Sequence, residues 1–344
     1  MESYLTGRSQ IATVGGQFSK PVELNFGSPQ GSRLSPPLFI ILMADLDLWS
    51  TGGELSQFAD DNQSSLMKNS EEELKKAAKE ESEAVVSHFG ANNLVNNADK
   101  AALLYNNKGR GDTITMEIAG EDITSVPREK LLGLHFSSAI DWKVHIEKTI
   151  QKLNQRLGIL RRLKCKIPKS KLKIIAEAIF TSVARYGIAV YSKPRLHSDP
   201  IGEDMCKLQV TQNKMFRLLD GKSKKDKVSV EKIAKKFEMM SINQMTCYHI
   251  LMETYKIIHF GASDKLRSKL VPNSKMSKNL QVPLVKRSSC RGFTYFAAKL
   301  WNSLPPQIKM RERPCQEESP DRKRLNGFKN DICKWICHCG VPFK

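Results

Sequence analysis

The sequence predicts an α+β protein, with an antiparallel sheet and packed helices in the first part of the chain and an all-helical remainder. Short β-type runs with glycine or aspartate turns occur at residues 1–26 and 54–67. A helix with a capping-box start follows at Ser70. After residue 141, apolar residues recur at steps of three and four, which is typical of amphipathic helices.

The elements of the first part each follow from a local signal. Gly15-Gly16 marks a turn within the lead-in, and Ser35 with Pro36 predicts a capped helix start. Ser70 and Glu73 form the capping box. The predicted elements are a strand-rich lead-in at 1–26 with runs at Ile11–Val14 and Val22–Phe26, a helix at 34–50, a hairpin at 54–67, a helix from Ser70 broken at Asn92–Asn97, and a β-type run at Ala101–Tyr105.

The composition is ordinary for a globular protein except for its charge. A chain of 344 residues, 40% hydrophobic and 26% charged, is long enough for two or three domains. The net charge of +19 predicts a polyanionic partner, with nucleic acid first and an anionic membrane surface as the rival. No apolar run approaches a membrane span, and the first ten residues lack a signal-peptide core. We therefore expect an intracellular protein, nuclear or cytoplasmic and not secreted, with no membrane partner.

Two adjacent carboxylates stand at the centre of the predicted hairpin. Phe58-Ala59-Asp60-Asp61 joins two short β-type runs, and Asp-Asp is typical of turns. Two acids at a turn offer oxygen ligands to a hard cation such as Mg²⁺. Taken alone, an Asp-Asp turn is usually only a solvated turn.

A glycine-bounded turn precedes this hairpin and runs into a helix. It reads Gly-Ser-Pro-Gln-Gly-Ser-Arg-Leu-Ser-Pro-Pro-Leu-Phe from Gly27 to Phe39. Helix capping accounts for Ser35 and Pro36, but it leaves Pro29 to Ser32 unexplained.

Together, the two stretches resemble the reverse transcriptases of non-LTR retrotransposons of the long-interspersed-element type. That family has a Gly-x-Pro-Gln-Gly-Ser-x-Leu-Ser/Gly-Pro-x-Leu-Phe block followed by Tyr/Phe-Ala-Asp-Asp, and both stand here in the same order and spacing. The resemblance implies RNA-directed DNA polymerisation by two-metal nucleotidyl transfer, with an RNA template, a DNA primer and deoxynucleoside triphosphates as partners. Asp60 and Asp61 would bind Mg²⁺ or Mn²⁺, and Pro29, Gln30, Gly31 and Ser32 would lie against the nucleotide and template.

The resemblance also implies that part of the active site lies outside this sequence. Residues 3–10 match the family's Ser-Tyr-Leu-x-x-Arg-x-Gln segment, and the family's first catalytic aspartate lies upstream of it. We therefore expect a partial polymerase palm that begins mid-domain, and a chain that alone is inactive or nearly so.

Two further segments are similar to family elements. Lys100 corresponds to the lysine of the Asn-x-x-Lys-Thr segment, which protonates the leaving pyrophosphate, although Ala101 replaces the threonine. A plain surface lysine is the equal alternative. Leu131–Phe136 resembles the primer-grip strand, with Leu132 and Gly133 near the primer backbone.

A strongly basic stretch follows where a thumb would follow the palm. Its two apolar stripes are Ile146, Ile150, Leu153, Leu157 and Leu160, then Leu172, Ile175, Ile179 and Val183. Eleven basic residues between Lys143 and Lys173 face one acid, Glu147. We expect this helical hairpin to contact the backbone of a template–primer duplex, and the residues concerned are Lys148, Lys152, Arg156, Arg161 and Arg162.

The carboxy-terminal part completes the expected domain organisation. Ala297 to Pro305 matches the family's Ala-x-x-Leu-Trp-Asn-x-Leu-Pro signature, whose aromatic residues we assign to a core rather than to base stacking. All eight cysteines lie at or after Cys165, and reduced thiols are expected. The expected segments are a partial palm at 1–140, a basic helical thumb at 141–195, a helical connection at 196–262, a polar linker at 263–290 and an aromatic helical segment at 291–344.

Three alternatives remain open from the sequence. Cys333, Cys337, His338 and Cys339 are soft ligands, but they lack a Cys-x-x-Cys pair, so the spacing does not favour zinc. The chain could be a non-catalytic nucleic-acid-binding remnant of a retrotransposon. It could also be a basic scaffold for acidic proteins.

Overall fold

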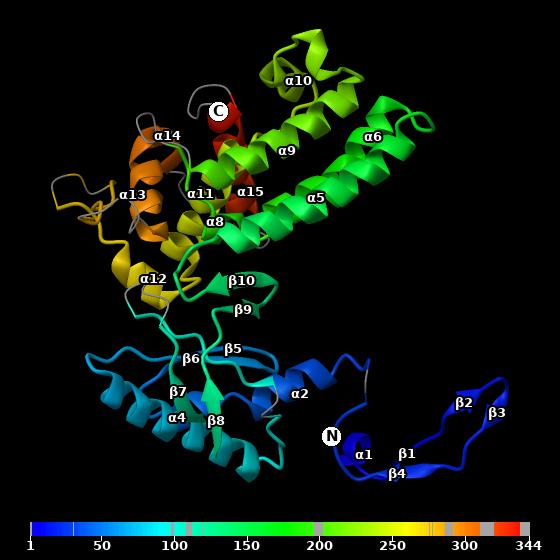
Figure 1. The fold of residues 1–344 in the computed structure, drawn as a ribbon, viewed down its shortest axis with the longest axis vertical. Coiled ribbons are helices and arrows are strands. Elements are labelled where there is room, and N and C mark those ends of the chain that lie inside the picture. The colour runs from blue at the N-terminus through cyan, green and yellow to red at the C-terminus, as the bar shows by residue number, and fades with distance from the viewer. Residues whose placement is uncertain are drawn as a thin grey trace. The chain divides into compact units, whose positions relative to one another are not determined.

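Antiparallel hairpins and one long helix build the first part of the chain, and helices build the rest. The computed structural model describes residues 2–29, 31–97, 100–107, 112–118, 120–195, 202–274, 276, 278–285, 292–309 and 320–337. The chain divides into two compact units, Met1–Gly133 with Ser137–Ile140, and Leu134–Phe136 with Asp141–Lys344 (Figure 1). We call them the mixed unit and the helical unit. The α+β class is thus confirmed in its general form.

The described strands pair only with near neighbours in sequence. Gly15 and Gly16 both have positive φ, and they form the turn between β2 (Thr13–Val14) and β3 (Gln17–Phe18), as the sequence predicts. The described strands are β1 (Arg8–Gln10), β2 (Thr13–Val14), β3 (Gln17–Phe18), β4 (Val22–Leu24), β5 (Glu54–Phe58), β6 (Asp61–Ser65), β7 (Thr115–Ile118), β8 (Glu121–Thr124), β9 (Arg128–Leu131) and β10 (Leu134–Ser137). They form five two-stranded antiparallel sheets, β1–β4, β2–β3, β5–β6, β7–β8 and β9–β10.

The helix predicted at 34–50 is two helices. α2 spans Ser35–Leu42 and α3 spans Leu46–Trp49, and α1 (Glu2–Leu5) precedes both. The break lets Met43 and Leu46 both turn inward and become buried. The prediction of Ser35 as N-cap was wrong, because Leu34 takes that position and Ser35 is the first helical residue.

Helix α4 (Glu71–Ala91) begins and ends as predicted. The Ser70 hydroxyl accepts a hydrogen bond from the Glu73 backbone N–H at 3.2 Å, and Asn92 ends the helix. Ala78 packs with Ile114 and Met116 in the small core of this unit. The predicted β-type run at Ala101–Tyr105 is wrong, since the chain there is irregular, although Leu103 and Tyr105 still pack against this core.

The helical unit contains two hydrophobic clusters, and both include residues of α11 (Ile242–Phe260). Its described helices are α5 (Lys143–Leu163), α6 (Lys169–Ala176), the π-helix η2 (Glu177–Thr181), α7 (Ser182–Arg185), α8 (Ile188–Tyr191), α9 (Glu203–Asp220), the 3₁₀-helix η3 (Lys224–Asp226), α10 (Val230–Lys236), α11 (Ile242–Phe260), α12 (Asp264–Lys269), α13 (Phe293–Ser303), α14 (Pro306–Lys309) and α15 (Pro320–Trp335). None of the described helices is long and apolar enough to span a membrane.

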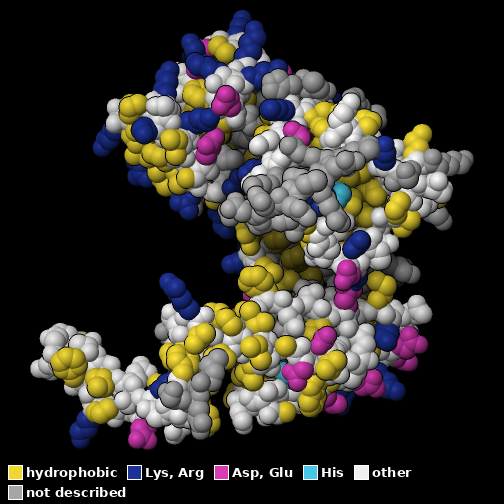
Figure 2. All heavy atoms as spheres, turned by 180° about the vertical axis from the view of Figure 1, so that it is seen from behind, with side chains coloured by type: hydrophobic (Ala, Val, Ile, Leu, Met, Phe, Trp, Pro, Cys, Tyr) yellow, Lys and Arg dark blue, Asp and Glu magenta, His cyan; other side chains and the backbone are white. Residues whose placement is uncertain are grey.

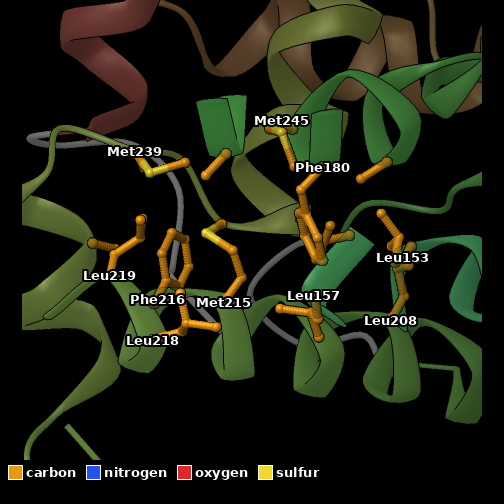
Figure 3. Packing of buried hydrophobic residues seen from close by; sticks show 14 of the residues in the cluster. Leu153, Leu157, Phe180, Leu208, Met215, Phe216, Leu218, Leu219, Met239 and Met245 are labelled. Carbon is orange, nitrogen blue, oxygen red and sulfur yellow. The ribbon is translucent and has the colours of Figure 1, made fainter. Parts of the chain in front are cut away.

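The first cluster joins the segments expected as separate thumb and connection. Leu153 and Leu157 of α5 pack with Phe180 of η2 and with Leu208 and Met215 of α9 (Figure 3). Both predicted apolar stripes therefore face one core, and residues 141–195 and 202–245 fold together. Burial of this many apolar side chains is the main source of the stability of the unit.

The second cluster explains the Leu-Trp-Asn-x-Leu-Pro signature. Leu300, Trp301 and Leu304 are buried, so the aromatic residue serves a core, as expected. Asn302 exchanges two 2.8 Å hydrogen bonds with the backbone of Leu280, from its Nδ2 to the carbonyl and to its Oδ1 from the N–H. The signature thus fixes the segment before α13 onto the core.

A buried histidine makes the stability of the helical unit depend on pH. Burial, and then the neighbouring His135 and Lys152, lower the pKa of His145 to about 4. In the unfolded chain, His145 takes up a proton as the pH falls through about 6.5, whereas in the folded chain it does so only near pH 4. The free energy of unfolding therefore decreases as the pH falls. Between pH 7 and 5, we expect a loss of about 2 kcal/mol in the free energy of unfolding from this group. Denaturant unfolding followed by tryptophan fluorescence measures it, and a His145→Gln variant should show a flatter profile. An equal profile in both proteins contradicts the assignment.

Candidate functional site

The Asp-Asp hairpin presents both carboxylates to solvent. Phe58 pairs with Asp61 as the last rung of the β5–β6 ladder, so the two-residue turn is Ala59-Asp60 rather than Asp60-Asp61. Ala59 has a φ of 55°, the positive value that the first position of a tight hairpin turn requires. Asp60 and Asp61 are exposed, and neither carboxylate has a hydrogen bond or ion pair to another described residue. Their oxygens are therefore available to a ligand.

A buried carboxylate of α4 holds the open end of this hairpin. Glu81 is 3% exposed, and it accepts hydrogen bonds from side chains and backbone at both strand ends. Before β5, the Ser50 hydroxyl donates at 2.7 Å, and the backbone N–H groups of Thr51 and Gly53 donate at 2.8 and 3.1 Å. From β6, the Ser64 hydroxyl donates at 3.0 Å. One side chain thus fixes where β5 begins and where β6 ends.

The hydrogen bonds also keep Glu81 ionised. Burial by itself raises the pKa of this carboxyl, but the donors from Ser50, Thr51, Gly53 and Ser64 outweigh burial and lower the pKa below its usual value. A buried charge is tolerated only when it is hydrogen-bonded in this way. The hairpin and the carboxylate therefore stabilise each other.

The Pro-Gln-Gly block is fixed by the segment at the start of the chain. The Ser35 hydroxyl donates to the Pro29 carbonyl at 2.6 Å, which closes the turn onto the start of α2. The Tyr4 hydroxyl donates to the Ser32 hydroxyl, and the Arg8 guanidinium donates to the Gly27 carbonyl at 2.5 Å. The two stretches that resemble neighbouring family segments are therefore in contact here. Gly31 has a φ of 82°, and Gln30 lies outside the described residues.

Two contacts connect the block's helices to the hairpin and to α4. The Gln57 amide of β5 donates to the carbonyl of Met43, just after α2, at 3.2 Å. His88 Nε2 of α4 lies 2.8 Å from the carboxylate of Asp45. No hydrogen bond or ion pair between described residues joins Asp60 or Asp61 directly to the Gly27–Ser35 turn.

Lys100 and the predicted primer-grip residues have different local structures from those expected. Lys100 is exposed and ends a single turn, with no strand after it. Leu132 and Gly133 have φ values of 46° and 82°, so they form the turn between β9 and β10 rather than part of a continuous strand. Two positive φ values in succession are typical of a two-residue hairpin turn, and glycine at the second position makes it possible.

The described residues do not complete a metal centre. No group of three or more His, Cys, Asp and Glu side chains among them is arranged to hold a metal ion. The two hairpin carboxylates fit a hard cation by their chemistry, as two ligands of a larger set. Cys333 and Cys337 are free thiols, whereas His338 and Cys339 lie outside the described part of the chain.

Charge divides sharply between the two units. Residues 1–140 have 12 Lys and Arg against 19 Asp and Glu, a net charge of −7, whereas residues 141–344 have 43 against 17, a net charge of +26. Lys and Arg gather over the end of the helical unit that α5, α6, α9 and α10 form (Figure 2).

One face of α5 concentrates this positive charge. Lys148, Lys152 and Arg156 recur every four residues outside the buried stripe, and all three are exposed. Arg161 and Arg162 continue the basic side chains to the end of the helix. None of the five forms an ion pair with a described acidic residue, whereas Lys207 and Lys235, on neighbouring helices, do. The α5 basic face, defined by these five residues, is therefore uncompensated.

Sequence reasoning missed the two polar residues that organise the mixed unit. Glu81 and His88 are buried in α4, at 3% and 0% exposure. Both continue the helical spacing of Leu74, Ala78 and Val85, so their positions on the apolar stripe were the available signal. A polar residue at a core position indicates a buried hydrogen-bond network.

Gly53 offers a direct test of the Glu81 network. An added Cβ at Gly53 would lie 2.6 Å from Glu81 Oε1 and even closer to the Ser64 hydroxyl, so the network would have to move. We expect Gly53→Ala to lower the free energy of unfolding by about 3 kcal/mol. Gly90→Ala in α4 is the matched control, because a Cβ there meets nothing within 4 Å and alanine favours a helix. Equal stability of the two variants in denaturant titrations would count against the network.

Comparisons with protein-family models, with curated proteins and with solved structures found no match to this chain. The assignment of a function therefore depends on its own motifs and on the geometry of the hairpin and the basic face.

Proposed function

We propose that this chain is the palm and thumb part of a reverse transcriptase of the non-LTR retrotransposon type, and that its helical unit binds the template–primer backbone. The observation that carries the proposal is the uncompensated α5 basic face. Exposed cationic side chains without a carboxylate partner repel one another, which raises the free energy of the folded chain. A bound phosphate backbone neutralises these charges and removes the repulsion. Contacts of this kind fix position on a duplex without reading its sequence.

The hairpin supplies the chemical part of the proposal. Asp60 and Asp61 would hold Mg²⁺ or Mn²⁺ with their free carboxylates, and the bound ions would stabilise the charge that develops on the transferring phosphate. The acidic net charge of the mixed unit favours cations at this hairpin. Glu81 would position both aspartates by fixing the strand ends.

The remaining motif residues have supporting roles in this proposal. Pro29, Gln30, Gly31 and Ser32 would form the backbone surface against the incoming nucleotide and template. Lys100 would give a proton to the leaving pyrophosphate. Leu132 and Gly133, at a hairpin tip, would approach the primer strand closely because glycine has no side chain.

A non-catalytic nucleic-acid-binding role is the second candidate. The α5 basic face favours it, because phosphate contacts there do not depend on the hairpin carboxylates. A scaffold for acidic proteins is a third candidate function. It predicts that the chain binds nucleic acid no more tightly than acidic polypeptides.

Salt dependence of binding tests the α5 basic face. We expect the triple variant Lys148→Gln, Lys152→Gln, Arg156→Gln to bind a short RNA–DNA duplex more weakly than the unmodified chain. The slope of log K against log salt should fall by about 2 to 3, because each lost phosphate contact removes about 0.9. The control variant Lys269→Gln, Lys278→Gln, Lys329→Gln removes the same charge from exposed positions elsewhere in the helical unit. If both variants change the slope equally, α5 has no specific role.

Cation binding tests the hairpin separately. Mn²⁺ can replace Mg²⁺ as a paramagnetic probe, and we expect the full chain with bound duplex to retain it. The double variant Asp60→Asn, Asp61→Asn should lose this binding, because amides do not supply the charge of carboxylates. Asp47→Asn, at an exposed acidic residue of α3, is the control. Unchanged Mn²⁺ binding in the double variant would remove the hairpin from the proposal.

A further inference from the structure

A second basic surface lies at one end of the helical unit, where two loops far apart in sequence meet. The turn between α5 and α6 spans residues 164–168, and the loop between α9 and α10 spans residues 221–229. The Lys169 ammonium, at the start of α6, donates to the carbonyl of Asp220, the last residue of α9, at 3.2 Å. The carboxyl ends of α5 and α9 therefore lie at the same end of the bundle (Figure 1).

The exposed lysines of these two loops, together with one lysine of the first turn of α6 (Lys169–Ala176), form what we call the tip patch. They are Lys164, Lys166, Lys171, Lys222, Lys225 and Lys227. None of the six forms an ion pair with a described carboxylate.

The acids near the tip patch are already used within the fold. Asp226 accepts from the Ser223 backbone N–H in a capping box, which lowers the pKa of its carboxyl. Asp220 accepts from Lys236 at 2.5 Å. Their charges remain, and the charge of Lys222 also helps to lower the pKa of Asp226, but the hydrogen bonds that these two carboxylates accept come from Ser223 and Lys236 rather than from the six lysines.

The lysine-bearing loop after α9 has a defined structure before any ligand binds. Gly221 ends α9 with a φ of 77°, and the Lys222 N–H bonds back to the Arg217 carbonyl at 2.9 Å. Ser223 and Asp226 then cap the short η3 helix, and Lys227 holds a φ of 48°. Because the backbone is ordered in advance, less entropy is lost when the lysines bind a ligand.

We propose that the tip patch is a second phosphate-binding surface, separate from the α5 basic face, and that it extends the nucleic-acid footprint beyond that face. The inference rests on the proposed nucleic-acid binding. Several exposed ammonium groups without specific hydrogen-bond acceptors suit a phosphate backbone, in which sequence-independent charge neutralisation supplies the affinity. An anionic membrane surface is the competing partner, and the experiment distinguishes it.

Binding by three triple variants of the full chain tests this proposal. The tip variant is Lys222→Gln, Lys225→Gln, Lys227→Gln, and it is compared with the α5 variant and the Lys269, Lys278, Lys329 control described above. With an RNA–DNA duplex, we expect the tip variant to lose on the order of tenfold in affinity at low salt, with a salt slope about 2 to 3 smaller. The corresponding Lys→Arg triple variant keeps the charge and should keep the binding. Circular dichroism checks that each variant is folded.

The possible outcomes separate the two proposals. If the tip variant behaves like the control while the α5 variant is weakened, the tip patch is overturned and the proposed function stands. If neither the α5 nor the tip variant differs from the control, both fail. If the tip variant binds the duplex normally but loses binding to phosphatidylserine vesicles, the nucleic-acid role of the patch is overturned in favour of a membrane surface. Weakening of duplex binding by the tip variant, with the Lys→Arg variant unaffected, supports the proposal.

Discussion

The mixed unit depends on one buried carboxylate. Its sheets have only two strands each, and a lone hairpin is marginally stable in water, so β5 and β6 need an external anchor. Glu81 provides that anchor by accepting hydrogen bonds from Ser50, Thr51, Gly53 and Ser64. Hydrogen bonds to a charged group contribute about 1.5–3 kcal/mol each, which offsets the cost of burying the charge. An apolar residue at this position would remove the acceptor of five donors, the three hydroxyls of Ser50, Thr51 and Ser64 and the backbone N–H groups of Thr51 and Gly53.

This anchor leaves the tip of the hairpin free. Asp60 and Asp61 are at the end of the ladder opposite the Glu81 contacts, and their carboxylates make no described contact. A site that binds a cation needs ligands held in place by groups that do not themselves compete for it. In the proposed cation site, Glu81 would hold the hairpin in place and leave the carboxylates of Asp60 and Asp61 free for the ion. The positive φ of Ala59 adds local strain at the same turn, which is common where backbone geometry serves a ligand.

The sequence predicted the α+β class and many local elements because those signals were local. Glycine pairs, the Ser70 cap and the stripe from Ile146 to Leu160 each specify structure over a few residues. The failures have a different cause. The helix predicted at 34–50 is broken before Leu46, and Asp45 at the break contacts His88, 43 residues further along the chain, which no local pattern encodes. The Ala101–Tyr105 run has strand-like composition but no described partner strand. Of the candidate site, the hairpin and the exposed basic residues were predictable, whereas Glu81 and the meeting of the two loops at Lys169 and Asp220 required the tertiary structure.

The acidic mixed unit and the basic helical unit attract ions of opposite charge. Nucleotidyl transfer brings together a polyanion and divalent cations, and a surface that attracts one repels the other. A single basic domain would bind template and primer but lower the cation concentration at its own acids. Here the acids Asp60 and Asp61 belong to a unit of net charge −7, and the lysines proposed to contact phosphate belong to a unit of net charge +26. Segregation of charge between the units is therefore the arrangement that lets one chain attract both reactants of the proposed reaction.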